Sequence, residues 1–167
     1  MKKVYYTVYK FKELSKEAKQ KAIDDYYEDS DYPFLYEELY SWLEELLEKN
    51  KITITGETKL YYSLSYSQGD GLCFIGNFKW RKYYVKITHS GHYYYSNSTT
   101  IDIENEEAEY ASEKTIERFK KIYTKICDKL EKIGYEELEY RPTFKEFEDL
   151  CDSNKYTFLN DGTVDNE

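Results

Sequence analysis

Two β-strand patterns meet at a polar corner that contains two glycines, Ser65–Gly71. Apolar and polar positions alternate before the corner from Lys59 to Tyr66, and the alternation resumes from Leu72 to Trp80. A period of two residues is typical of half-buried strands. Asp-Gly favours a hairpin, because glycine accepts a positive φ and aspartate accepts hydrogen bonds from nearby amides. The corner therefore predicts a hairpin with a wide tip, where Gln68 and Asp70 are candidate partner-binding residues.

The rest of the chain predicts helices around a sheet. We expect helices over 16–28 with Ser15 as N-cap, after Pro33, over 105–133 up to Gly134, and from a capping box at Thr143. Further strands are expected at 4–11, 52–54, 83–89, 93–103 and 156–158. Short connections favour an antiparallel meander. The predicted fold class is α+β, a curled antiparallel sheet with helices packed on one face, in a single domain spanning residues 1–167.

Composition argues against several classes of protein. The three cysteines are odd in number and far apart, so we expect reduced thiols rather than a disulfide framework or a metal clip. We find no signal peptide and no apolar stretch long enough to cross a membrane, which predicts a cytoplasmic protein. The chain has no nucleophile elbow and no phosphate-binding loop before a helix. We therefore expect neither a catalytic residue nor a cofactor.

One segment concentrates negative charge. Between Lys21 and Lys49 there is no basic residue, and the carboxylates are Asp24, Asp25, Glu28, Asp29, Asp31, Glu37, Glu38, Glu44, Glu45 and Glu48. We interpret these ten residues as a partner-binding surface, because rows of carboxylates can imitate a nucleic acid and occupy a groove lined with Lys and Arg. The alternative is a solvated acidic face on a chain whose formal net charge is -9.

A later segment carries the opposite charge. The helix expected over 105–133 holds seven cations, namely Lys114, Arg118, Lys120, Lys121, Lys125, Lys129 and Lys132. If this helix faces the acidic segment, the two charges neutralise each other, and the sequence alone leaves that question open. Trp42, within a row of leucines, fits either the core or a dimer interface.

Two alternatives to the acidic surface remain open. His89 and His92, the only histidines, could bind a divalent metal with Asp70 and support a hydrolase or nuclease, provided that the two turns lie at the same end of the sheet. A sheet face with tyrosines beside cations could instead bind single-stranded nucleic acid. The residues for that face are Tyr61, Tyr84 and Tyr94 with Lys59, Lys79, Arg81 and Lys86. The acidity of the chain makes direct nucleic-acid binding the weaker expectation.

Several motifs also carry a resemblance that covers nearly the whole chain. They are Phe11–Ser15 followed by Glu17 and Ala18, Ser67–Gly71 before Phe74, Ile87–Tyr94, and Asn154–Phe158. With them the chain resembles a family of phage and prophage proteins, most of them uncharacterised and some labelled automatically as toxin–antitoxin components. The resemblance implies a phage origin and a host protein as partner. Together with the acidic segment, it leads us to expect a non-enzymatic inhibitor or modulator of a host nucleic-acid-binding factor, of the anti-defence or anti-CRISPR kind.

Overall fold

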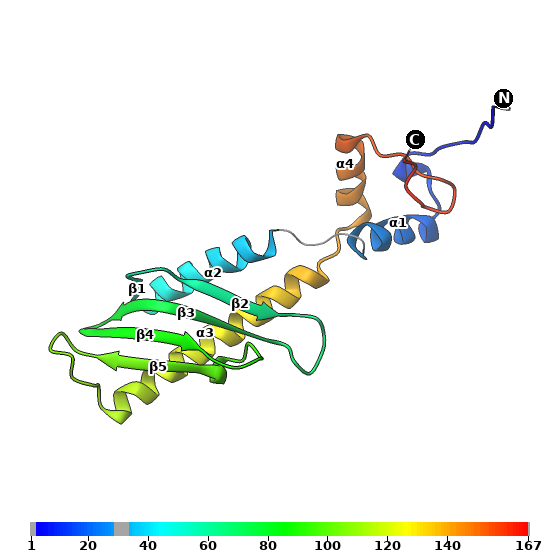
Figure 1. Cartoon of the computed structure of the whole chain (residues 1–167). Coiled ribbons are helices and arrows are strands. Elements are labelled where there is room, and N and C mark those ends of the chain that lie inside the picture. Colours follow the sequence, from blue (N-terminus) through cyan, green and yellow to red (C-terminus); the bar gives the residue numbers. More distant parts are fainter. Residues whose placement is uncertain (1–2, 29–33, 167) are drawn as a thin grey trace. The chain divides into compact units, whose positions relative to one another are not determined.

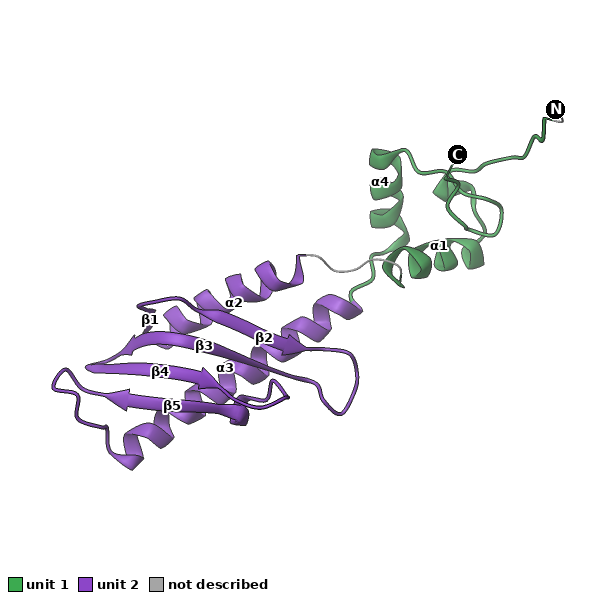
Figure 2. Cartoon of the chain, viewed as in Figure 1, with its two compact units in different colours: residues 1–32, 140–167 green, residues 33–139 purple. Residues whose placement is uncertain are grey.

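The computed structural model describes residues 3–28 and 34–166. The chain divides into two compact units, residues 1–32 with 140–167 and residues 33–139 (Figure 2). The first unit therefore contains both ends of the sequence, and the second is a continuous segment inserted between them. The sequence predicts that residues 1–167 form a single domain, and this stays a prediction for the two units.

The larger unit is an antiparallel sheet with helices on one face (Figure 1). Its strands are β1 (Ile52–Ile54), β2 (Lys59–Ser63), β3 (Gly71–Trp80), β4 (Tyr83–His89) and β5 (Thr99–Glu104). They follow the order β1-β3-β4-β5, and β2 pairs with the first half of β3. Helices α2 (Leu35–Lys49) and α3 (Glu113–Glu139) lie side by side and pack against this sheet. This arrangement confirms the predicted α+β class, the curled antiparallel sheet and the helices on one face.

The register of the strands separates a covered face from an open one. Phe78 lies opposite Val85, and Val85 lies opposite Ile103, so three buried side chains share one row. Trp80, two residues after Phe78, packs against Phe119 of α3 with ring centroids 5.2 Å apart. The alternate residues, such as Lys79 and Tyr84, are exposed. The period-two pattern at the end of β3 therefore indicated correctly that Phe78 and Trp80 share one buried face.

Four expected strands have different boundaries in the structure. The strands expected at 4–11 and 156–158 reduce to one bridge between Tyr9 and Phe158, and the chain continues into a 3-10 helix at Phe11–Glu13. The strand expected from residue 93 begins at Thr99, after a 3-10 turn at Ser96–Ser98. Strand β2 ends at Ser63 rather than at Tyr66, which adopts a φ of 58° in the tip.

Helix α3 does not stop at Gly134 as expected but continues to Glu139. Gly134 is buried where α3 passes Leu39 of α2, and a Cβ at this position would overlap the Leu64 side chain. Close packing of α2 and the tip against α3 therefore explains this glycine, which the sequence pattern indicated as a helix end.

The smaller unit packs helices α1 (Lys16–Glu28) and α4 (Phe144–Asn154) around an apolar core. The predicted caps are confirmed: Ser15 Oγ accepts a hydrogen bond from the Ala18 amide at 3.1 Å, and Thr143 and Glu146 form the capping box. Phe11 lies at the centre of the core, with its ring 5.0 Å from that of Phe147. The core is largely aromatic, which suits a unit of few residues because each ring buries a large area.

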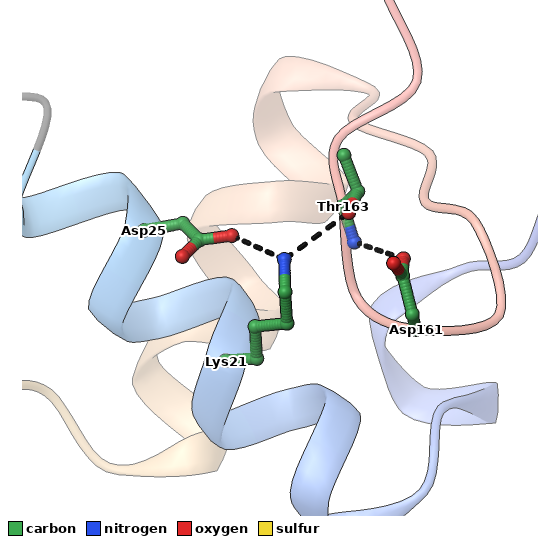
Figure 3. A network of polar contacts seen from close by, with 4 residues as sticks. All are labelled: Lys21, Asp25, Asp161 and Thr163. Carbon is green, nitrogen blue, oxygen red and sulfur yellow. Dashed lines mark hydrogen bonds and ion pairs between the residues drawn. The ribbon is translucent and has the colours of Figure 1, made fainter.

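The C-terminal turn of this unit is fastened to α1 by Lys21 (Figure 3). Its Nζ donates to Asp25 Oδ2 at 2.6 Å and to Thr163 Oγ1 at 3.1 Å. The Thr163 amide donates in turn to Asp161 Oδ1 at 2.9 Å. Beside this network, Gly162 lies against the carbonyl of Ala18. The last turn of the chain is therefore part of the packing of α1.

The three cysteines, Cys73, Cys127 and Cys151, are buried free thiols. Burial raises the pKa of Cys73 and of Cys151 to about 11 in each case, so both stay protonated at neutral pH. This agrees with the expected reduced state. In the described parts of the chain, we find no helix with the length and apolar character needed to cross a membrane.

Candidate interaction surfaces

The outer face of α2 presents a row of glutamates. The leucines of this helix point into the larger unit and are buried at Leu35, Leu39, Leu43, Leu46 and Leu47. The opposite side carries Glu37, Glu38, Glu44, Glu45 and Glu48, of which Glu38 is half-buried and the other four are exposed. We call these five residues the acidic face. The amphipathic spacing that buries the leucines therefore also gathers the carboxylates on one side.

Few cations lie near the acidic face, and one of them, Lys51, lines a pocket with Glu44 and Glu48. Lys49, at the end of α2, is the one cation of the helix. Across residues 3–28 and 34–166, none of the five carboxylates forms an ion pair. A partner could therefore approach these groups without first breaking an ion pair.

Of the other five predicted acidic residues, three belong to the smaller unit and two lie outside the described residues. Asp24, Asp25 and Glu28 are on α1. Asp25 is paired with Lys21, and Asp24 Oδ1 accepts a hydrogen bond from Gln20 at 3.0 Å. Asp29 and Asp31 lie outside the described residues. The structure therefore brings together the five α2 carboxylates of the ten predicted residues and assigns three others to a separate unit.

Helix α3 carries a basic row on its own outer face. Six of its seven predicted cations recur at intervals of three or four residues and are exposed, namely Lys114, Arg118, Lys121, Lys125, Lys129 and Lys132. We call these six residues the basic face, which extends over about 27 Å at 1.5 Å per residue. Within the described chain, one of its members is ion-paired, Lys132 with Glu136 at 3.9 Å. No described ion pair joins α3 to α2, so direct pairing does not neutralise the acidic face.

The polar tip between β2 and β3 is organised by Asp70. Its carboxylate accepts hydrogen bonds from the Ser65 amide at 2.9 Å, from Ser65 Oγ at 3.0 Å and from Ser67 Oγ at 3.1 Å. Tyr135 of α3 donates its hydroxyl proton to the same carboxylate. The acceptor positions of Asp70 are thus largely filled by donors from the tip and from α3. The geometry supports a role for Asp70 in holding the tip rather than in contacting a partner.

Two further hydrogen bonds hold the tip. The hydroxyl of Tyr95 donates to the carbonyl of Gln68 at 2.9 Å, and the Tyr66 hydroxyl donates to Glu139 at 2.8 Å. The side chain of Gln68 is exposed. Of the two tip residues expected to bind a partner, Gln68 therefore has the accessible side chain.

These hydrogen bonds shift two pKa values. Burial alone would raise the pKa of Asp70, but the donors Tyr135, Ser65 and Ser67 outweigh it and hold the pKa well below its ordinary value of 3.8. Burial and the contact with Asp70 raise the pKa of Tyr135 to about 12. Both shifts favour the pair of an ionised carboxylate and a neutral phenol at neutral pH.

Replacing the carboxylate tests this pair. Asp70→Asn is expected to lower the free energy of unfolding at neutral pH, because the amide nitrogen of asparagine cannot accept the hydrogen bonds. A carboxyl with a depressed folded-state pKa stabilises above its unfolded pKa of about 4, and the contribution is lost as the pH falls toward the folded value. The stability difference between wild type and variant should therefore shrink below about pH 4.

Urea unfolding at neutral pH and at about pH 3 measures that difference. Tyr135→Phe, which removes one of the donors, should reproduce part of the effect and part of its pH dependence. A difference between wild type and Asp70→Asn that stays constant from neutral to acid pH would contradict the proposed role of the ionised carboxylate.

The candidate metal ligands are not brought together. The two turns do lie at the same end of the sheet, as the Tyr95–Gln68 hydrogen bond demonstrates. His89 Nε2, however, lies 2.8 Å from the carbonyl oxygen of Tyr93, which can only accept, so this nitrogen carries the proton. The His92 ring packs on Tyr93. Among the residues that the structure describes, no group of three His, Cys, Asp or Glu side chains could hold a metal ion.

The three tyrosines proposed to stack on nucleic-acid bases have different surroundings. Tyr61 and Tyr94 stack on each other with centroids 5.4 Å apart, so each ring already has a partner. Tyr84 lies on the open sheet face with Lys79 5.6 Å above its ring. Its neighbour across the sheet is Glu104, and Asp102 lies opposite Lys86. The remaining cations are also engaged, since Lys59 pairs with Glu57 and the Arg81 guanidinium lies 4.8 Å from the Trp80 ring. Carboxylates beside these lysines weaken the case for a phosphate-binding surface.

Sequence reasoning identified most of the surface groups and missed the internal partner of the tip. The spacing of three and four residues would have assigned six of the α3 cations to one face. Tyr135 carries no local signal of its contact with Asp70, 65 residues earlier in the chain. In comparisons with known proteins, the chain matches no protein-family model, no curated protein and no solved structure.

Proposed function

We propose that this chain is a non-enzymatic binding protein that acts by placing the acidic face of α2 in a basic, nucleic-acid-binding groove of another protein. The observation that carries this proposal is the set of five glutamates on one helix face that form no ion pair within the described residues. A groove lined with Lys and Arg would supply the missing counter-charges and would release its bound anions.

The charge density of the acidic face supports mimicry of a nucleic acid. From Glu37 to Glu48 the helix rises about 16 Å, so its five carboxylates give roughly one charge per 3 Å. A single DNA strand carries one charge per about 3.4 Å. The resemblance to phage proteins suggests a host factor as the partner, which would make the protein an inhibitor or modulator of that factor.

Charge reversal on α2 tests the proposal. The tagged chain is used to capture partners from host lysate beside Glu37→Lys/Glu44→Lys and a matched control, Glu106→Lys/Glu107→Lys. All four glutamates are exposed, and both variants change the net charge equally. We expect a basic nucleic-acid-binding protein to be retained by wild type and control, to bind the α2 variant at least about tenfold more weakly, and to be displaced by added DNA.

Two results would contradict the proposal. Equal retention by the α2 variant would remove the acidic face as the contact. Retention of no protein by wild type would remove the expected partner class.

A further inference from the structure

Residues 4–9 of the smaller unit form an exposed segment whose composition favours a strand. They are valine, tyrosine and threonine without any charged residue, and these types are enriched in strands. Val4 is 82 % and Tyr5 is 86 % exposed, whereas Tyr6 and Val8 are 46 % and 40 % exposed. Figure 1 shows the segment as an extended chain that leads away from the helices of this unit. Four large apolar side chains within five residues therefore form a patch that the single chain leaves in water.

The backbone of this segment has one covered edge and one open edge. Tyr9 donates its amide to the Phe158 carbonyl at 2.8 Å and accepts from the Phe158 amide at 2.9 Å, so both backbone groups of Tyr9 point to the same edge. Because successive residues of an extended chain direct these groups to opposite edges, the amide and carbonyl of Val8 point to the other edge. Within residues 3–28 and 34–166, these two groups of Val8 have no hydrogen-bond partner. An open edge of this kind is a template for pairing with another strand.

A second copy of the same chain fits this edge, because the order Tyr-Tyr-Thr-Val-Tyr over residues 5–9 is nearly symmetric about Thr7. In an antiparallel pair with a two-fold axis at Thr7, Tyr5 lies opposite Tyr9 of the second copy and Tyr6 lies opposite its Val8. The two Thr7 residues lie opposite each other. Aromatic pairs, aromatic pairs with β-branched residues, and threonine pairs all stabilise neighbouring strands. We propose that residues 5–9 of two copies pair as antiparallel strands and make this protein a two-fold symmetric homodimer.

At Tyr9 the paired strands join a small sheet. Phe158 forms one β-bridge with Tyr9 and another with Val164, so each strand of the pair is flanked at this end by two segments of its own copy. Two strands alone are marginally stable in water, and further paired segments stabilise them. The paired stretch is short, so we expect a dimer that forms at about 0.1 mM protein or above. It uses the smaller unit, so the inference does not depend on the partner proposed for the acidic face of α2.

Disulfide trapping with the purified full-length chain tests the register. The two Thr7 residues would form a pair without backbone hydrogen bonds, where the Cα atoms lie about 4.5 Å apart, within the range of a disulfide. Lys3→Cys is the matched control for Thr7→Cys, since both positions are exposed, but residue 3 would lie about 26 Å from its counterpart at 3.3 Å per residue. The native cysteines are buried, so each variant presents one accessible thiol. We expect Thr7→Cys to form a covalent dimer at least about tenfold faster than Lys3→Cys under mild oxidation.

Sedimentation velocity tests the open edge without a cross-link. Val8→Pro removes the amide that points to this edge and should raise the dissociation constant of the dimer at least about tenfold. Val8→Thr keeps the amide and the branched Cβ, so it should dimerise like wild type. A wild type that stays monomeric at about 0.5 mM protein would overturn the proposal. Cross-linking of Thr7→Cys and Lys3→Cys at the same rate, or a dimer that Val8→Pro leaves unchanged, would also overturn it.

Discussion

Gly162→Ala is expected to unfold the smaller unit under conditions where the wild-type unit is folded. Gly162 adopts a φ of +93°, and a Cβ there would overlap the carbonyl oxygen of Ala18 in α1. The left-handed conformation costs about 1–2 kcal/mol for a residue with a Cβ. The overlap adds to this cost because the Ala18 carbonyl is backbone of a helix and cannot rotate away. We expect a total loss of about 3 kcal/mol or more.

Gly91→Ala separates the cost of the backbone conformation from the cost of the steric overlap. Gly91 has a similar φ of +103°, but nothing lies within 4 Å of its Cβ position. It should therefore lose about 1–2 kcal/mol from backbone strain alone. Equal losses in the two variants would contradict the close approach of Gly162 to α1.

Hydrogen exchange followed by segment extends this experiment to the domain organisation. In Gly162→Ala, the segment 16–28 should lose protection because α1 packs on the altered turn. If the segment 35–49 loses protection in parallel, the two units unfold together, as the prediction of a single domain requires. If that segment stays protected, the two units are separate cooperative domains.

Tyr123→Phe is expected to destabilise the larger unit by about 3 kcal/mol. The Tyr123 side chain is 1 % exposed, and its hydroxyl accepts from the Phe74 amide at 3.1 Å and donates to the Phe74 carbonyl at 2.8 Å. The variant leaves two buried backbone groups of β3 without this partner, and each costs about 1–3 kcal/mol. Burial also raises the pKa of Tyr123 far above its ordinary value, so the hydroxyl keeps its proton to donate.

Urea denaturation of wild type and variant measures this loss, and exchange of the Phe74 amide locates it. Tyr84→Phe is the matched control, since Tyr84 is 45 % exposed on the open sheet face and should change stability by less than about 0.5 kcal/mol. A loss below about 0.5 kcal/mol in Tyr123→Phe would mean that the Phe74 amide and carbonyl do not depend on the tyrosine hydroxyl.

The local elements of the fold were predictable because their signals lie within a few residues. Ser15 and Thr143 begin α1 and α4 as their side chains indicate, and the leucines of α2 recur at helical spacing. The alternation in β3 correctly separated Phe78 and Trp80 from Lys79. The same spacing places glutamates on the outer face of α2 and cations on that of α3.

Long-range packing decided the features that were predicted wrongly. Gly134 has the signature of a helix end, yet α3 continues because α2 and the tip pack closely on it there. The segment 4–11 is rich in strand-forming residues, but only Tyr9 of this segment forms a β-bridge, and its partner is Phe158. In each case the partner is distant in sequence, so a local pattern carries no information about it.

For the candidate surfaces too, local properties were predictable from the sequence and long-range contacts were not. The sequence by itself determined which helix is acidic, which is basic, and on which side of each helix the charges lie, because these properties follow from residue type and a repeat of 3.6 residues. Only the tertiary structure decided that α2 and α3 are neighbours, that α1 belongs to another unit, and that Asp70 is engaged by Tyr135. These facts depend on which distant segments bury their apolar faces against each other. The packing of the whole core determines those pairs of segments.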